Sequence, residues 1–355
     1  MATEQASKRI KPNGFTPNGP LIGTHNGHFH ADEALAVYLL RLLPTYNPST
    51  LLRTRDPSLL ATCHTVVDVG GEYDPRKNRY DHHQRTFDAT FPSRPTKLSS
   101  AGLVYLHFGK PIIAQKSGFR EDSEEVGILW NKLYAEFVEA LDANDNGIGV
   151  YDPQDVKGVE KRFNDGGVSL GSLVGDLNWA FEEGEVPSTE GAQQAEDQRF
   201  LGASQLMGTI FLRKLDYYTK AWLPARTQVR ETHAARFEWD DQGRIMLFQQ
   251  GCPWKDHLYT IEAEDEVKEE NKVLYVLYPE SEKEESKWRI QAVAISKDSF
   301  ESRKALPEAW RGVRDAELSA ISGIDGSIFV HASGFIGGNA TKEGSLSMAR
   351  KAFTP

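Results

Sequence analysis

The first half of the chain alternates short apolar runs with amphipathic helical patterns. Strands are expected at residues 21–22, 51–56 and 65–71, and helices at 31–43, which Pro44 ends, and near 58–63. Strands that alternate with helices in this way predict a parallel sheet with helices on its faces. We therefore expect an α/β fold in this part of the chain.

The pattern changes further along. Residues 124–142 have the strongest helical periodicity of the first half, 151–178 form an expected long ordered loop, and 189–235 return to helix. Short strands follow at 244–248, 272–278 and 288–295, with acidic hairpin tips at 262–270 and 280–285 and a last helix at 340–352.

These patterns predict four regions. They are a disordered tail (1–17), a domain with a parallel sheet (18–188), a connecting helix (189–235) and a smaller α+β domain (236–355). The overall class is therefore α/β followed by α+β.

Composition narrows the class of protein. The net charge of −10 disfavours a long non-specific nucleic-acid track but allows a short strand held at a metal site. The two cysteines fit a reducing compartment, and no apolar run reaches the roughly 18 residues of a membrane span. The polar start favours an intracellular protein over a secreted one, and Lys8–Lys11 is a weak candidate nuclear address.

Metal-binding side chains gather where the first strand ends and the first helix begins. His25, His28, His30 and Asp32 lie within ten residues, and Glu33 follows directly. In open α/β sheets this crevice is where ligands bind. A site with both imidazole and carboxylate ligands favours Mn, Zn or Fe ions over Mg or Ca ions.

A second group of metal-binding side chains follows about fifty residues later. Asp81, His82 and His83 are consecutive, and Asp68 ends the strand between the two groups. Ligands at successive strand ends can converge on one metal site. Residues 72–81 are an expected loop. Four basic residues on or near it either are solvated or contact a phosphate; these are Arg76, Lys77, Arg79 and Arg85.

Other polar positions each have two interpretations. Asp142 and Asp145 at a helix end either bind a cation, which would offset the unfavourable helix dipole, or form a simple turn. Ser99 or Ser100 caps a helix or offers amides to a phosphate. Trp254 either stacks on a base or packs in the core, and the glycine-rich turn at 331–339 can cradle a phosphate.

Together these segments resemble the Asp-His-His (DHH) phosphoesterase superfamily, and within it the melanocyte proliferating gene (Myg) exonuclease family. The matching stretches are THNGHFHADEALA (24–36), RTRDP (53–57), VVDVGGEYDP (66–75), YDHHQRTF (80–87), KLSSAGLVY (97–105), LDANDNGI (141–148), GCPWKDHL (251–258) and SGFIGGN (333–339). The resemblance runs from about residue 20 to the C-terminus. It implies that residues 18–188 form a DHH-type metal-binding catalytic domain and residues 236–355 a substrate-binding domain.

The resemblance implies a centre with two Mn²⁺ ions, for which Mg²⁺, Zn²⁺ or Fe²⁺ are alternatives. Its metal ligands would be His25, His30 (where the superfamily usually has aspartate), Asp32, Asp68 as the bridge, His82, and Asp142 or Asp145. Its catalytic residues would be His83, which contacts the substrate phosphate, Asp81 and Arg85. Asp81 would either bind metal itself or contact a residue that does. Its substrate-binding residues in the second domain would be Trp254, Lys255, His257, His331, Gly334, Gly337 and Gly338.

The function implied by the resemblance is a 3′-to-5′ exoribonuclease that hydrolyses short or single-stranded RNA with a metal-activated water. It implies no membrane partner, allows a homo-oligomer, and is compatible with nucleus, cytoplasm or mitochondrion. Two alternatives remain: a small-molecule phosphoesterase, such as a pyrophosphatase or nucleotide phosphatase, and a protein that binds metal and nucleic acid without catalysis.

Overall fold

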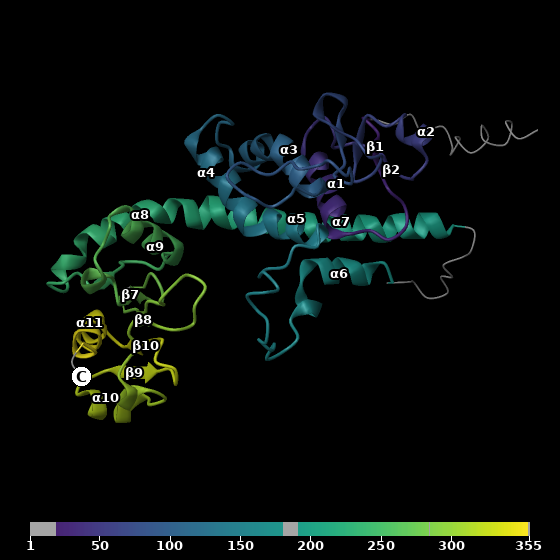
Figure 1. Ribbon diagram of the computed structural model, residues 1–355. Coiled ribbons are helices and arrows are strands. Elements are labelled where there is room, and N and C mark those ends of the chain that lie inside the picture. The colour runs from purple at the N-terminus through teal and green to yellow at the C-terminus, as the bar shows by residue number, and fades with distance from the viewer. Residues whose placement is uncertain (1–18, 180–190, 284, 354–355) are drawn as a thin grey trace, which may run out of the picture. The chain divides into compact units, whose positions relative to one another are not determined.

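The computed structural model describes residues 19–179, 191–283 and 285–353 (Figure 1). The expected tail at 1–17, with its basic cluster, lies outside these ranges. The chain divides into two compact units, Met1–Tyr218 and Thr219–Pro355. The boundary falls within the expected connecting helix, which consists of α7 (Ala192–Tyr217), a π-helical turn (Tyr218–Trp222) and α8 (Leu223–Ala234).

Unit 1 is built on a five-stranded sheet in the order β2-β1-β3-β5-β4. The strands are β1 (Ile22–Thr24), β2 (Leu51–Arg53), β3 (Thr65–Val67), β4 (Tyr73–Asp74) and β5 (Arg79–Tyr80). All neighbouring pairs are parallel except β4 with β5. The three predicted strands are confirmed, and because they run parallel, the segments after them meet at one edge of the sheet.

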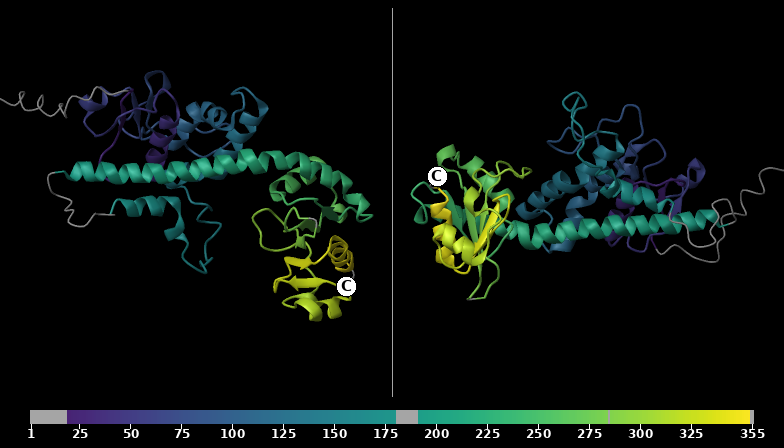
Figure 2. Two further views of the ribbon diagram at one scale, coloured as in Figure 1. Left: turned by 180° about the vertical axis from the view of Figure 1, so that it is seen from behind. Right: turned by 90° about the horizontal axis from the view of Figure 1, so that it is seen from below.

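The helices described before α7 are α1 (Ala31–Leu42), α2 (Pro57–Leu60), α3 (Ser100–Ser117), α4 (Glu124–Leu133), α5 (Glu139–Asp145) and α6 (Leu170–Leu177). Of these, α1 packs on β3 and α3 packs on β5. Helix α1 is almost wholly buried because it packs against both α3 and α7. Both views in Figure 2 show α7 running the length of unit 1 as one long helix.

Three segments of unit 1 differ from expectation. The expected loop at 72–81 holds β4, a 3-10 turn (Pro75–Lys77) and β5. The expected loop at 151–178 ends in a 3-10 turn (Gly166–Val168) and α6, whose N-cap is Ser169. The helix predicted at 124–142 extends to Asp145 and contains a π-helical turn, Tyr134–Val138.

Unit 2 contains a second five-stranded sheet, in the order β6-β7-β8-β10-β9. Its strands are β6 (Ile245–Leu247), β7 (Tyr275–Pro279), β8 (Trp288–Ala292), β9 (Ser327–Val330) and β10 (Ile336–Asn339). Its helices after α8 are α9 (Lys255–Glu264), α10 (Asp315–Ser322) and α11 (Lys342–Lys351), with 3-10 turns at Ala235–Glu238, Glu269–Asn271 and Glu308–Trp310. Nowhere in the described ranges is a helix both long and apolar enough to span a bilayer.

The prediction of a hairpin tip at 262–270 was wrong. β6 and β7 are parallel, so the chain must cross over between them, and α9 forms that crossover. Glu262 is buried on α9, where its Oε2 lies 2.7 Å from Arg303 Nη2 and its Oε1 accepts a hydrogen bond from Val273 N. A charged residue can therefore lie inside because a partner far along the chain pairs with it.

Candidate metal centre

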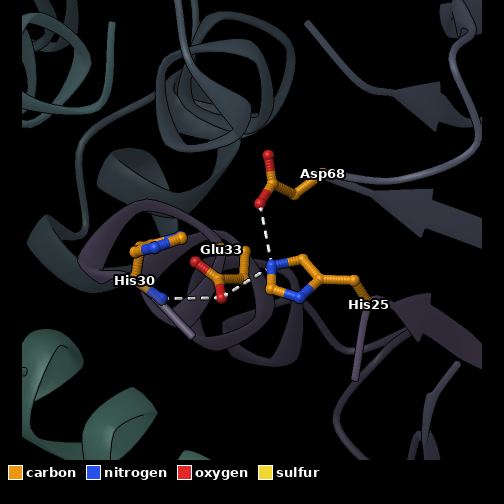
Figure 3. A group of neighbouring side chains, drawn as sticks. All are labelled: His25, His30, Glu33 and Asp68. Atoms are coloured by element: carbon orange, nitrogen blue, oxygen red, sulfur yellow. Dashed lines mark hydrogen bonds and ion pairs between the residues drawn. The ribbon is translucent and has the colours of Figure 1, made fainter. Parts of the chain in front are cut away.

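The histidine-rich turn connects β1 to α1, and the first turn of α1 fixes its geometry. Glu33 Oε1 accepts a hydrogen bond from His30 N at 2.8 Å and lies 3.2 Å from His25 Nε2. Figure 3 shows the side chains of His25, Glu33 and Asp68 meeting, with His30 on the other side of Glu33. Glu33 therefore belongs to the cluster and also stabilises the start of the helix.

Asp68 lies between the two histidine groups. It follows β3 in the left-handed region, with φ of 60°, a conformation that is costly for a residue other than glycine. Its Oδ2 lies 3.2 Å from His25 Nε2, and its Oδ1 lies 3.2 Å from His82 Nε2. His82 Nε2 in turn lies 3.0 Å from Asp145 Oδ2. One carboxylate therefore joins both imidazoles.

The donor atoms form three overlapping groups, each within 4.8 Å: His25, His30, Glu33 and Asp68; Asp68, His82 and His83; and His30, Asp32 and Asp145. Several of these buried atoms have no hydrogen-bond partner among the described residues: Asp32 Oδ1, Glu33 Oε2, Asp68 Oδ1, His82 Nδ1 and His82 Nε2. Unsatisfied buried polar atoms are costly, so their convergence fits a cation. The imidazole–carboxylate set favours Mn, Zn or Fe.

The carboxylates and imidazoles control one another's protonation. Burial lowers the pKa of His25, but Asp68 and Glu33 outweigh burial and raise it to about 10. Burial likewise lowers the pKa of His82, and Asp145 and Asp68 raise it to about 10. Burial raises the pKa of Asp68, but the two histidines outweigh it and lower it to about 2. Without metal, the histidines therefore carry protons that the cluster stabilises.

Asp32 is a second buried carboxylate in the first turn of α1. Burial first, and then the charges of Asp68, Glu33 and Asp145, raise its pKa well above the usual value. Ser100 Oγ donates a hydrogen bond to Asp32 Oδ2 at 2.7 Å. Ser100 therefore contacts the cluster directly rather than capping α3.

The carboxylate of Asp81 contacts His83 rather than the histidines of the two other donor positions, His25 and His82. Asp81 Oδ1 lies 2.6 Å from His83 Nδ1, and Gly71 N donates to Asp81 Oδ2 at 2.5 Å. The bond to Asp81 raises the pKa of His83 despite its partial burial. His83 is 60% exposed, so Nε2 is the ring nitrogen available to a ligand.

The clusters line a pocket of about 780 Å³. Its wall also includes Arg55, Lys97, Asn144 and Asn146. None of the basic residues expected to contact phosphate, Arg76, Lys77, Arg79 and Arg85, lines this pocket. Arg76 pairs with Asp74, Lys77 pairs with Glu72, and Arg79 donates to main-chain carbonyls. Arg85 is exposed outside the pocket wall.

The structure separates the roles of the two aspartates at the end of α5. Asp145 faces His82, whereas Asp142 is fully buried away from the cluster. Asp142 Oδ1 accepts hydrogen bonds from Ser99 N, Ser99 Oγ and Gly102 N, and Oδ2 accepts one from Tyr134 at 2.9 Å. Burial raises the pKa of Asp142 to about 7, and these hydrogen bonds partly offset burial. Asp142 thus joins α5 to the start of α3.

Comparison with known proteins identifies the family. The sequence profile of the MYG1 exonuclease family, described as an uncharacterised protein family (UPF0160), matches residues 21–353. The chain belongs to this family. It is 49% identical to the human MYG1 exonuclease over 338 residues, which are 93% of this chain and 85% of the human protein. No solved structure matches it.

Other MYG1 relatives match over similar lengths. The bovine MYG1 exonuclease is 47% identical over 357 residues, covering 99% of this chain and 89% of that protein. The MYG1 protein of Saccharomyces cerevisiae is 40% identical over 344 residues, which cover 97% of this chain and 98% of the yeast protein. The expected membership of this family is therefore confirmed.

Contacts from two distant helices hold the histidine-rich turn of this MYG1 family member. Asn178, after α6, accepts a hydrogen bond from Phe29 N at 3.0 Å and donates one to Phe29 O at 2.9 Å. Arg53 donates to Gly27 O at 2.7 Å and pairs with Glu196 of α7 at 2.8 Å. The turn between His25 and His30 is therefore fixed by residues outside the cluster.

The residues of unit 2 that were expected to bind substrate differ in exposure: some are buried in the core or within a strand, and others are exposed. Trp254 is buried in the apolar core, and buried His257 lies 2.7 Å from Trp222 O through Nε2, so both are packing residues. Gly337 and Gly338 lie within β10 between β8 and β9, so their amides face paired strands rather than a turn. Lys255 and His331 are exposed, and Gly334 forms the turn before β10.

Sequence reasoning missed three residues of the centre in this family member: Glu33, Arg55 and Lys97. Glu33 stood directly after Asp32 in the first histidine-rich motif, but acidic residues are common in the first turn of a helix. Arg55 and Lys97 lay inside motifs used for the family resemblance. No local pattern indicates that they face the same pocket.

Proposed function

We propose that this protein is a metal-dependent phosphodiesterase that removes nucleotides from the 3′ end of short or single-stranded RNA. One observation carries the proposal: Asp68 joins two imidazole-containing donor groups, several of whose buried atoms make no hydrogen bond within the described residues, inside a pocket that also holds two cationic side chains. Membership of a family whose mammalian proteins are named exonucleases supports it.

The residues fit a pair of divalent ions, in agreement with the resemblance to the DHH phosphoesterases. His25, His30, Glu33 and Asp68 would hold one ion, and Asp68, His82 and Asp145 the other, with Asp32 beside both groups. When bound, two such ions lower the pKa of a water molecule and neutralise charge on a phosphoryl group. We propose Mn²⁺ as the resident metal, since both donor groups mix imidazole with carboxylate.

His83 is placed to act on the substrate itself. Asp81 fixes its Nδ1, so the ring presents Nε2 to the pocket and its raised pKa favours the protonated form. In the proposed hydrolysis, water attacks phosphorus and the P–O3′ bond breaks. His83 donates a hydrogen bond to the phosphoryl oxygens or a proton to the departing 3′ oxygen.

The test uses metal-stripped protein with Mn²⁺ added back. A 5′-labelled short RNA and, separately, pyrophosphate are the substrates, with Asp68→Ala and His82→Ala as variants. The proposal expects a ladder that shortens from the 3′ end and disappears in both variants.

Two other results would contradict the proposal. Release of phosphate from pyrophosphate with the RNA intact would indicate a small-molecule phosphoesterase. Bound metal without turnover of either substrate would indicate a binding protein.

A further inference from the structure

Two cationic side chains line the metal pocket without a carboxylate partner. Arg55 and Lys97 both belong to the pocket wall, and neither forms an ion pair within the described part of the chain. Three other basic side chains of unit 1 do pair with carboxylates: Arg53, Arg76 and Lys77. Unpaired cations in a pocket that otherwise presents carboxylates and imidazoles point to an anionic ligand.

Lys97 is held on the side of the pocket that carries His82 and Asp145. Asn146, the residue after Asp145, donates from Nδ2 to Lys97 O at 3.0 Å. The Lys97 ammonium lies 5.3 Å from the centre of the Phe87 ring, and Phe87 contacts the His82 ring edge-to-face at 6.2 Å. The half-buried lysine is therefore fixed beside this imidazole rather than extended into solvent.

Arg55 follows β2, the neighbour of the strand that ends just before His25. β2 pairs in parallel with β1, with Arg53 opposite Thr24, and Thr54 N donates to Thr24 O at 2.8 Å. Asp56 then caps α2 through Ser58 N. The main chain on both sides of Arg55 is thus fixed, while its exposed side chain reaches the pocket.

We propose that Arg55 and Lys97 are substrate-positioning residues that bind consecutive phosphates of a nucleic-acid strand. One binds the phosphate that is cleaved, and the other binds the neighbouring phosphate. This inference rests on the proposed function and deepens it, since it selects substrates with at least two phosphodiesters. The guanidinium and ammonium groups would stabilise negative charge at either side of the metal centre.

The test measures kcat/KM on 5′-labelled oligoribonucleotides across a series of salt concentrations. Arg55→Gln and Lys97→Gln should each lower kcat/KM roughly 10- to 100-fold, mainly through KM. Each should flatten the slope of log kcat/KM against log salt by about 0.7, the value per phosphate contact on a single strand. The wild-type protein should prefer a trinucleotide, which has two phosphodiesters, to a dinucleotide, and the double variant should lose this preference.

Matched controls separate this role from general charge and from folding. Arg76→Gln and Lys77→Gln remove the same charges from side chains that pair with carboxylates, and should leave rate and slope unchanged. Arg55→Lys and Lys97→Arg should restore the salt slope. Metal content should be the same in all variants.

The inference would be overturned if the wild-type protein degrades RNA and both Gln variants keep its kcat/KM and salt slope. The proposed function would then remain intact. An inactive wild-type protein with bound Mn²⁺ would instead overturn the proposed function itself.

Discussion

The carboxylate of Asp142 occupies the space that a side chain at Gly102 would need. A Cβ atom at residue 102 would lie 2.3 Å from Asp142 Oδ2 and 2.5 Å from Oδ1, while Gly102 N donates to Oδ1 at 3.0 Å. The absence of a side chain on α3 thus allows a buried acid on α5 to accept hydrogen bonds from the main chain of α3.

Replacing Gly102 with alanine should therefore destabilise the protein. Overlap with a fixed, buried group costs about 1–3 kcal/mol in the free energy of unfolding. Chemical denaturation measures the loss. Gly127→Ala on α4, where a Cβ meets nothing within 4 Å, is the control and should change stability by about 1 kcal/mol or less, toward greater stability. Equal effects of both changes would contradict the role given to Asp142.

Asp142 and Asp145 should respond differently to the same substitution. Asp142→Asn places an amide group against four donors and should lower the free energy of unfolding by about 1–3 kcal/mol while Mn²⁺ still binds. Asp145→Asn should weaken Mn²⁺ binding by more than the roughly 10- to 100-fold typical of an outer partner, with little loss of stability. Calorimetric titration measures the Mn²⁺ affinity of both variants, and chemical denaturation measures their stability. A loss of affinity in Asp142→Asn and a loss of stability in Asp145→Asn would reverse the assignment of the two aspartates.

Binding of Mn²⁺ to the metal-free protein should release protons. The pKa values of His25 and His82 are raised to about 10, so both rings are protonated at pH 7.5 and must lose a proton to bind metal. We expect release of about two protons, and hence an apparent affinity that rises roughly 100-fold per pH unit. Titration calorimetry in buffers of different ionisation enthalpy counts the protons; a count near zero would contradict this scheme.

The same shifts predict how the stability of the metal-free protein depends on pH. A histidine whose folded pKa is raised contributes stability fully below its unfolded pKa of about 6.5, and loses that contribution as pH rises toward 10. Asp68, whose pKa is lowered to about 2, contributes above about pH 4 and loses its contribution below that. The melting temperature should therefore fall between pH 6.5 and 9.5 without metal and change less with Mn²⁺ bound.

Removing the Asn178 side chain should weaken the metal centre from outside it. Asn178→Ala breaks the two hydrogen bonds that hold Phe29 and should lower the free energy of unfolding by about 1–3 kcal/mol. Because Phe29 precedes His30, Mn²⁺ affinity should also fall. Asn131→Ala, at an exposed amide on α4, is the matched control. Unchanged metal affinity in Asn178→Ala would show that the turn keeps its geometry without this support.

The sequence predicted the elements whose patterns are local. The strands before Gly23 and Asp68, and the buried helix after His30, follow from apolar runs and a proline stop. The placement of His25, Asp68 and His82 at one edge follows from the parallel order of those strands. Convergence of these three residues could therefore be expected before any coordinates existed.

Features that depend on distant partners escaped prediction. The two-residue strands β4 and β5 are too short to show a period, and α6 lies in a stretch rich in Gly, Asp and Asn. Glu262 looked solvated because its partner Arg303 is 41 residues away. Trp254 looked available for stacking, whereas tertiary packing of α9 buries it.

All donors of the metal centre, from His25 to Asp145, belong to the first of the two units of the chain. Substitutions in the second unit therefore leave the set of donor side chains unchanged. During evolution the C-terminal half can therefore diverge in sequence without the loss of a single candidate donor.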